Sequence, residues 1–191
     1  MSSPSPRILA FAASLRKSSL NRRLLRYAID GAVAAGGQVE ELPSEFLQLP
    51  LYNGDLEGNG RYPADVETWR AKIGEADGLL IASPEYNHGV SGVLKNAIDW
   101  GSRPPNIFGG KVAASFGVTS GLWGTARSQT SLRLILTPLG VWVVPKTVLI
   151  ASGKQAFDET GQLKDPKLRD ELAAVGRILA GAVQAGIGRL A

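Results

Sequence analysis

Short apolar runs alternate with amphipathic segments along this chain, and this alternation limits the possible folds more than any other feature. The run Ile8-Leu9-Ala10-Phe11-Ala12 carries no charge and is typical of a strand that is buried on both faces. The next segment places apolar side chains at Leu20, Leu24 and Ala28, the spacing of a helix with one buried face. Repeated strand–helix alternation favours a parallel sheet with helices on both faces.

The pattern predicts five strands and five helices. The expected strands are residues 7–12, 38–42, 77–82, 111–118 and 141–150, the last of them interrupted by Pro145. The expected helices are residues 20–35, 63–74, 92–100 and 126–136, and a last helix that opens at Asp165-Pro166. Right-handed crossovers favour the strand order 2-1-3-4-5, which places a ligand crevice at the carboxyl ends of strands 1 and 3.

The length of 191 residues suits one domain, expected over residues 7–191 after a loose polar tail over residues 1–6. The chain has no cysteine and one histidine, which excludes disulfides, thiolate nucleophiles and His- or Cys-rich metal sites. No apolar run approaches the roughly 20 residues of a membrane helix, and no secretory signal is present. We therefore expect a cytoplasmic protein.

The net charge of +4 comes largely from the start of the first helix. The cluster consists of Arg16, Lys17, Arg22, Arg23 and Arg26. No nucleic-acid-binding module accompanies it, so nucleic acid is not an expected partner. A local anion site and a solvated helix face both remain open as explanations.

The stretch Ala13-Ser14-Leu15-Arg16-Lys17-Ser18-Ser19-Leu20-Asn21 lies where the first strand leads into its helix. Free amides at a helix start, together with serine hydroxyls and the fork of an arginine, form a cradle for a phosphate monoester. Neither the GxxxxGK[ST] nor the GxGxxG motif is present. The alternative is that the serines only cap the helix and the basic residues face solvent.

The loop after the third strand reads Pro84-Glu85-Tyr86-Asn87-His88-Gly89. Tyr86 offers a flat apolar face, and Asn87 with nearby amides can read the edge of a planar heterocycle such as an isoalloxazine. The alternative is a turn in which Tyr86 merely covers the core.

The loop after the fourth strand reads Thr119-Ser120-Gly121-Leu122-Trp123-Gly124. Its two glycines let backbone approach a ligand closely, and Thr119 and Ser120 can donate to a pyrimidine edge. The alternative is a helix entry with structural glycines. The three loops would meet in one crevice if the predicted strand order holds.

Taken together, the three loops resemble the NADPH-dependent FMN reductase family, in particular its chromate- and quinone-reductase branch. The family pattern G-S-L-R-x-x-S-x-N is matched by Ser14 to Asn21, with Ala13 in place of the glycine. The pattern P-E-Y-N is matched in full at residues 84–87, and Leu94 to Trp100 also match. The resemblance implies a flavodoxin-like three-layer α/β fold with a five-stranded parallel sheet.

The resemblance further implies non-covalent FMN, with NAD(P)H as the co-substrate. It places the phosphate on the first loop and the flavin ring between the second and third loops, with no catalytic side chain and no metal. The implied cofactor-binding residues are Ser14, Arg16, Ser18, Ser19, Leu20, Asn21, Pro84, Glu85, Tyr86, Asn87, His88, Thr119, Ser120 and Gly121. His88 stands where this branch often has tyrosine, and Leu122 and Trp123 are bulkier than the usual third loop.

The implied reaction is ping-pong transfer of a hydride from NAD(P)H through FMN to a small-molecule oxidant. Quinones, chromate, azo and nitro compounds or free flavin are the candidate oxidants. A non-catalytic flavodoxin-like electron carrier is the alternative, although such carriers are usually strongly acidic and this chain has a net charge of +4. Family resemblance also implies a homodimer or homotetramer, with the helix after Ser91, the segment 100–108 and Arg127 as candidate contacts.

Overall fold

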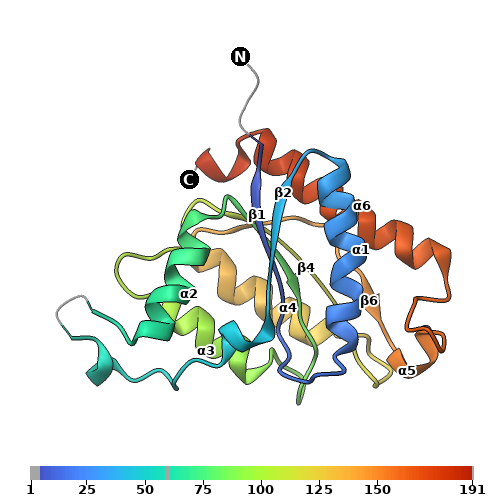
Figure 1. The fold of residues 1–191 in the computed structure, drawn as a ribbon, viewed down its shortest axis with the longest axis horizontal. Coiled ribbons are helices and arrows are strands. Elements are labelled where there is room, and N and C mark those ends of the chain that lie inside the picture. The colour runs from blue at the N-terminus through green and yellow to red at the C-terminus, as the bar shows by residue number, and fades with distance from the viewer. Residues whose placement is uncertain (1–4, 59–60, 191) are drawn as a thin grey trace.

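The computed structural model describes residues 5–58 and 61–190 and shows a parallel sheet flanked by helices (Figure 1). The strands are β1 (Arg7–Ala12), β2 (Gln38–Leu42), β3 (Gly78–Ala82), β4 (Val112–Val118), β5 (Trp142–Val143) and β6 (Leu149–Ile150). The helices are α1 (Leu20–Ala34), α2 (Ala64–Glu75), α3 (Gly92–Gly101), α4 (Ala126–Leu136), α5 (Gly153–Ala156) and α6 (Pro166–Gln184). Residues 1–4 of the expected tail lie outside the described residues.

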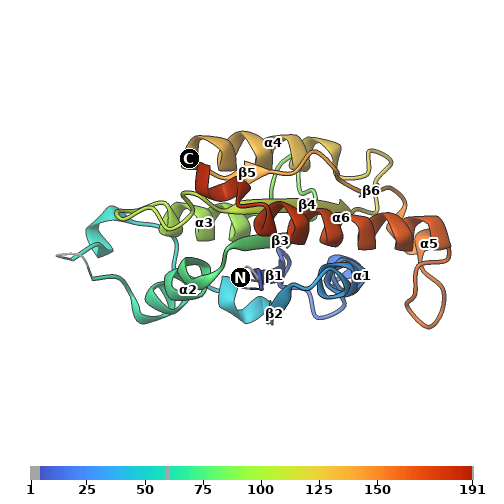
Figure 2. The same ribbon diagram turned by 90° about the horizontal axis from the view of Figure 1, so that it is seen from above.

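The sheet has the order β2-β1-β3-β4-β5, and the predicted topology is therefore confirmed. Strand β1 pairs in parallel with both β2 and β3, so the winding direction reverses beside it. Figure 2 shows the molecule from above, with α1 and α6 on one face of the sheet and α2 and α3 on the other. This arrangement is the expected three-layer sandwich.

Alternate residues of β1 supply the two halves of the core. Ile8 and Ala10 point into the cluster with α1 and α6, whereas Leu9 and Phe11 point into the cluster with α2, α3 and α4. Every residue of β3 and β4 is buried, as expected for central strands that are covered on both faces. The sheet is thus a rigid platform for the loops at its carboxyl edge.

The predicted fifth strand, residues 141–150, is wrong as a single element. It consists of two short strands, and both pair with β4: β5 at Val112 and Ala113, and β6 at its far end. Pro145 lies between them and has no N–H to donate to a ladder. Between the two short strands the chain stays bonded to β4 through Thr147, whose hydroxyl donates to Ser115 O at 2.6 Å.

Most helix boundaries agree with the sequence prediction. Ser91 caps α3 by accepting from Leu94 N, and Asp165 caps α6 by accepting from Lys167 N at 2.8 Å. Helix α2 begins one residue after Pro63 instead of at it. The connection over residues 43–60 contains two 3₁₀ turns, Ser44–Leu47 and Gly54–Leu56, and α5 was not predicted.

No helix within the described ranges 5–58 and 61–190 has both the length and the apolar character needed to cross a membrane.

Candidate functional site

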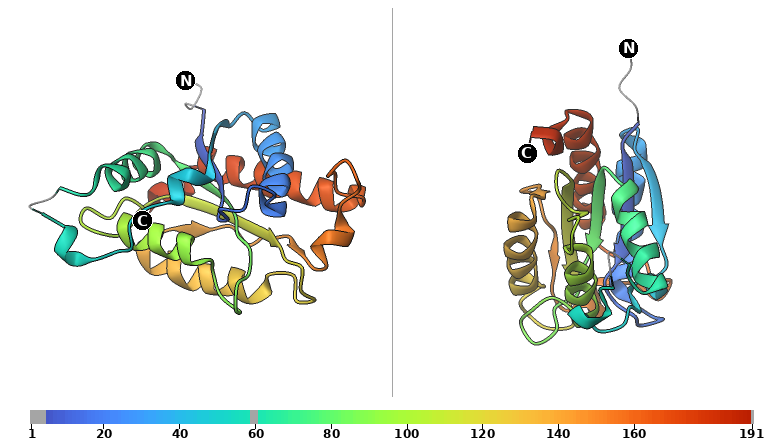
Figure 3. Two further views of the ribbon diagram at one scale, coloured as in Figure 1. Left: turned by 60° about the horizontal axis from the view of Figure 1, so that its bottom comes forward. Right: turned by 90° about the vertical axis from the view of Figure 1, so that its left-hand side faces the viewer.

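A cavity of about 610 Å³ opens at the carboxyl edge of the sheet. The left view of Figure 3 turns this edge toward the reader. The walls of the cavity come from the loops after β1, β3 and β4 and from the start of α5. The lining residues are Ser14, Arg16, Ser18, Ser19, Leu20, Asn21, Arg23, Pro84, Glu85, Tyr86, Val118, Thr119, Ser120 and Lys154.

The predicted crevice therefore exists, and it gathers all three loops. All six residues predicted on the first loop line it, together with Pro84, Glu85, Tyr86, Thr119 and Ser120. Asn87, His88 and Gly121 do not line it.

The first loop places its hydroxyls by ordinary backbone chemistry. Ser19 is the N-cap of α1, and its hydroxyl accepts from Arg22 N at 3.4 Å. Ser14 accepts from Arg16 N, and its hydroxyl lies 3.4 Å from the Tyr86 hydroxyl. Arg16 and Ser18 are exposed on the cavity rim. The helix capping that the sequence offered as the alternative explanation is thus present at Ser19, and the same serine lines the cavity.

Asn21 uses its side-chain amide to join the first helix to the end of β4. Its Nδ2 donates to Val118 O and its Oδ1 accepts from Val118 N, both at 3.0 Å. The side chain is 4 % exposed. The amide of Asn21 thus has a structural role, because it satisfies the backbone beside the third loop, while Asn21 also lines the cavity and its role toward a cofactor stays a prediction.

The cavity carries three cationic side chains, of which the sequence predicted one. Arg16 comes from the first loop and Arg23 from α1, whereas Lys154 comes from α5. Helix α5 is held close to the third loop because Gly153 N donates to Thr119 O at 2.8 Å. A Cβ at Gly153 would meet Val118 Cγ2 at 2.6 Å, so a larger residue would push α5 outward.

The second loop is a tight two-residue hairpin. Tyr86 N and Gly89 N each bond to the other residue's carbonyl at 3.1 Å. Asn87 and His88 occupy its tip with φ angles of 49° and 66° and are exposed. Asparagine tolerates this left-handed conformation well, which explains why it stands at the tip.

The third loop contributes hydroxyls rather than aromatic surface. Thr119 and Ser120 line the cavity, whereas the Gly121 carbonyl accepts from Ser152 N at 3.0 Å. Leu122 and Trp123 are 83 % and 67 % exposed, and the guanidinium of Arg127 lies 4.8 Å from the centre of the Trp123 ring.

Sequence reasoning missed Arg23, Val118 and Lys154. Arg23 belongs to the basic cluster that the sequence had already singled out, one turn into α1. Nothing in the sequence indicated that Lys154 lies at the cavity, because the strand predicted over residues 141–150, which precedes it, is wrong as a single element. Only the pairing of β6 with β4 brings α5 to the cavity.

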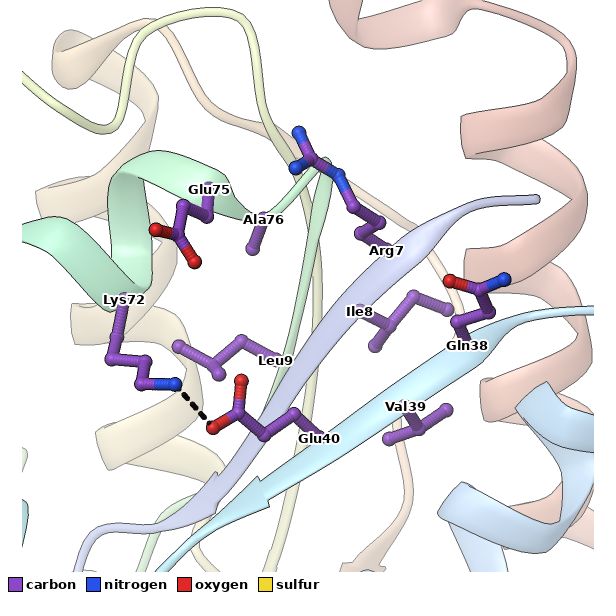
Figure 4. Close-up of a pocket in the computed structure, with 9 residues that line it drawn as sticks. All are labelled: Arg7, Ile8, Leu9, Gln38, Val39, Glu40, Lys72, Glu75 and Ala76. Carbon is purple, nitrogen blue, oxygen red and sulfur yellow. Dashed lines mark hydrogen bonds and ion pairs between the residues drawn. The ribbon is translucent and has the colours of Figure 1, made fainter. Parts of the chain in front are cut away.

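A smaller hollow of about 250 Å³ lies at the open β2 edge of the sheet (Figure 4). The Lys72 ammonium lies 2.7 Å from Glu40 Oε1 there, and this hydrogen bond raises the pKa of Lys72. No residue of the three loops lines this hollow. An exposed ion pair on an edge strand protects that edge from pairing with another chain and indicates no binding site.

The comparisons with known proteins agree with this geometry. A family model described as NADPH-dependent FMN reductase matches residues 6–155. The NAD(P)H-dependent FMN reductase of Pseudomonas aeruginosa is 45% identical over 166 residues, which cover 86% of this chain and 88% of the relative. The NADPH:quinone oxidoreductase of Arabidopsis thaliana is 45% identical over 177 residues, which cover 90% of this chain and 89% of the relative.

Among solved structures, the flavoenzyme NAD(P)H:(acceptor) oxidoreductase FerB from Paracoccus denitrificans superposes with a TM-score of 0.78 at 28% identity. The match covers 94% of this chain and 98% of that one. The fold is flavodoxin-like, and the cavity lies where the three loop motifs meet. This chain belongs to the NADPH-dependent FMN reductase family, a family of oxidoreductases that use FMN as cofactor and NAD(P)H as electron donor.

Proposed function

We propose that this enzyme passes electrons from NAD(P)H through FMN, held in the cavity at the carboxyl edge, to quinones. The observation that carries the proposal is the meeting of all three predicted loops around one cavity of about 610 Å³. That volume falls in the usual range for cofactor sites, about 300–1,000 Å³.

The lining residues fit FMN. Arg16, Arg23 and Lys154 supply positive charge for a phosphate, and Ser14 and Ser18 supply hydroxyl donors. The carboxylate that lines the cavity belongs to Glu85, and both of its oxygens are engaged with α4. No uncompensated negative charge among the described lining residues opposes a bound phosphate.

FMN, when bound, accepts a hydride from a reduced nicotinamide and returns electrons to an oxidant. The protein binds the cofactor through the first loop and α5 and orients it between the second and third loops. In this proposal the flavin carries the redox chemistry, and the side chains of the cavity wall bind and orient it. The cationic rim also attracts an anionic co-substrate such as NADPH.

The order of steps that belongs to this proposal is one in which the two substrates use the same flavin in turn. The nicotinamide gives its hydride to the flavin and leaves as NAD(P)+, and the oxidant then enters and takes the electrons, in a ping-pong sequence. Chromate, azo and nitro compounds and free flavin are further candidate oxidants. The relatives whose names include quinone oxidoreductase or FMN reductase favour quinones and flavin among these.

Absorbance spectroscopy with turnover tests the proposal. The purified protein, loaded with FMN, should show flavin bands that bleach on anaerobic addition of NADPH and return on addition of a benzoquinone. Steady-state NADPH oxidation should need both FMN and quinone and give parallel double-reciprocal lines. A protein that binds FMN and bleaches but shows no steady-state turnover with any of these oxidants would be an electron carrier instead.

We further propose a homodimer or homotetramer that acts in the cytoplasm. The third loop and α4 expose large apolar side chains, with Leu122 at 83 %, Trp123 at 67 % and Leu134 at 71 % exposure. Apolar surface of this kind often marks a contact between copies of a chain. Light scattering on the eluting protein would give the mass, and a monomer at micromolar concentration would contradict the assembly.

A further inference from the structure

Helix α4 begins without a cap of its own. Its N-cap position is Thr125, which has a φ angle of 69° and makes no side-chain capping hydrogen bond. The first amides of a helix have no partner inside the helix and need an acceptor from elsewhere. Because the start of α4 directly follows the third loop of the cavity, the source of that acceptor determines how the loop is held.

The missing cap comes from the second loop. Glu85 Oε2 accepts from Arg127 N at 3.0 Å and from Ser128 N at 3.1 Å, the amides of the first turn of α4. Glu85 Oε1 lies 3.7 Å from Arg127 Nη1, and the Glu85 side chain is 10% exposed. A shielded carboxylate at a helix N-terminus is stabilised by the helix dipole as well as by these bonds.

Neighbouring residues extend this contact along both segments. Ser128 Oγ donates to Pro84 O at 2.9 Å, and Gln129 Nε2 donates to Ser83 O at 3.3 Å. Three consecutive residues after β3 thus contact three consecutive residues of α4. The contact joins the two walls of the cavity through a rigid helix end.

The Glu85 carboxylate is also connected to the exposed part of the third loop. Arg127, which pairs with Glu85, lies 4.8 Å from the centre of the Trp123 ring. Removal of the carboxylate would therefore free both the helix start and the arginine that supports Trp123.

We propose that Glu85 is a positioning residue whose carboxylate, bound to the first turn of α4, fixes the separation of the second and third loops around the flavin ring. The inference rests on the proposed function, because it assumes a flavin in the cavity. Glu85 exchanges no proton with the flavin and does not act on the reacting atoms, since both of its oxygens are committed to α4. Its effect is on how tightly any flavin ring is held, whatever the ribityl chain carries.

Titration of apoprotein with FMN and with riboflavin tests this inference. Glu85→Ala should raise the Kd for both flavins by about tenfold, because the charge-assisted hydrogen bonds that hold the two loops in their binding positions are lost. Glu85→Gln, which keeps one acceptor oxygen for the amides, should raise both by a smaller factor. Arg16→Ala should weaken FMN alone, because riboflavin lacks the phosphate.

Asp165→Ala is the matched control, because it also removes a carboxylate cap, here from α6 and away from the cavity. If the loss of flavin affinity in Glu85→Ala only reflected lower stability, Asp165→Ala variants with a similar fall in Tm would lose flavin affinity too. We expect them not to. Iodide should also quench the bound flavin more strongly in Glu85→Ala than in the wild type, because the loops no longer enclose the ring.

Three results would overturn the inference. The first is wild-type affinity for both flavins in Glu85→Gln and Glu85→Ala. The second is an equal loss of affinity in Asp165→Ala. The third is a pH profile of NADPH-driven flavin reduction that loses an ionisation in Glu85→Gln, which would make the carboxylate a direct participant. Wild-type protein that binds neither flavin would instead overturn the proposed function, and this inference with it.

Discussion

Asn21 and Val118 lie 97 positions apart in the sequence and exchange two hydrogen bonds of 3.0 Å. The amide of Asn21 takes the place of a missing strand at the end of β4, where Val118 N and Val118 O would otherwise be unpaired. The pair ties the first loop of the cavity to the third. Asn21, which the sequence indicated as a cofactor ligand, therefore also holds the first and third loops of the cavity together.

Replacement of Asn21 by Ala should lower the free energy of unfolding by about 1–3 kcal/mol per buried backbone group left without a partner. Urea denaturation of the apoprotein measures this change. Asn53→Ala removes an amide that caps a 3₁₀ turn on an exposed loop, where water replaces it, and should cost less. Equal effects of the two substitutions would show that the Asn21 pair contributes nothing beyond a surface cap.

Arg16 should determine affinity for the phosphate and not for the ring. Arg16→Ala is expected to raise the Kd for FMN by at least about tenfold, the loss of one hydrogen bond to a charged group, and to leave riboflavin unchanged. Lys17→Ala provides the control, because Lys17 is the adjacent cation but does not line the cavity. Calorimetric titration with both flavins gives the answer, and a matching loss of riboflavin would refute the assignment.

Lys154 should add a weaker, salt-dependent contribution at the same end. It is exposed, so water and salt screen its charge, and we expect Lys154→Met to raise the Kd for FMN by up to about fivefold at low salt. The difference from the wild type should vanish at high salt. Lys167→Met, a change on α6 outside the cavity lining, should have no effect at either salt concentration.

The sequence predicted the sheet well because its signals are local. The apolar run of β1 and the caps at Ser91 and Asp165 each lie within one element, and topology rules then left the observed strand order as the natural solution. The part of the site that depends on where strands end could also be predicted. The carboxyl ends of neighbouring parallel strands lie at one edge of the sheet, so the loops that follow them meet in one cavity.

The parts that sequence reasoning missed depend on contacts between distant segments. Nothing near Asn21 shows that its partner is Val118, and nothing near Glu85 shows that α4 lacks its own cap. Lys154 reaches the cavity only because Pro145 divides the last strand and β6 pairs again with β4. Asn21 and Glu85 could only be interpreted as ligands in the sequence, because their partners are distant, and Lys154 could not be recognised at all.

Two glycines of α6 should respond to alanine substitution in opposite directions, because only one of them packs against α1. A Cβ at Gly176 would lie 1.9 Å from Ala28 O, whereas a Cβ at Gly181, on the same helix, meets nothing within 4 Å. Gly176→Ala should therefore destabilise the protein by about 1–3 kcal/mol or more through overpacking. Gly181→Ala should stabilise it by up to about 1 kcal/mol through helix propensity. Thermal melts of the two variants measure both changes, and a stable Gly176→Ala protein would contradict the close packing.

Lys111 should give the folded protein a distinctive pH dependence. Lys111 directly precedes β4, and its buried ammonium donates to Gly74 O at 3.2 Å and to Ala76 O at 2.6 Å, two carbonyls at the end of α2. Burial lowers the pKa of Lys111 below its ordinary value of 10.5. Between the folded and unfolded pKa values, the unfolded chain therefore binds more protons than the folded one.

The sign of the effect follows directly, because stability rises with pH wherever the unfolded state binds more protons. As pH increases from neutral toward 10.5, the contribution of Lys111 to the free energy of unfolding should increase. Lys111→Met removes the titrating group, so the free energy of unfolding of the wild type minus that of the variant should become more positive with pH over this window. Lys164→Met, at an exposed position, should track the wild type. Urea midpoints measured at several pH values test this. A constant difference would show that the ammonium remains protonated in its buried site, and a falling difference would show that its pKa is raised instead of lowered.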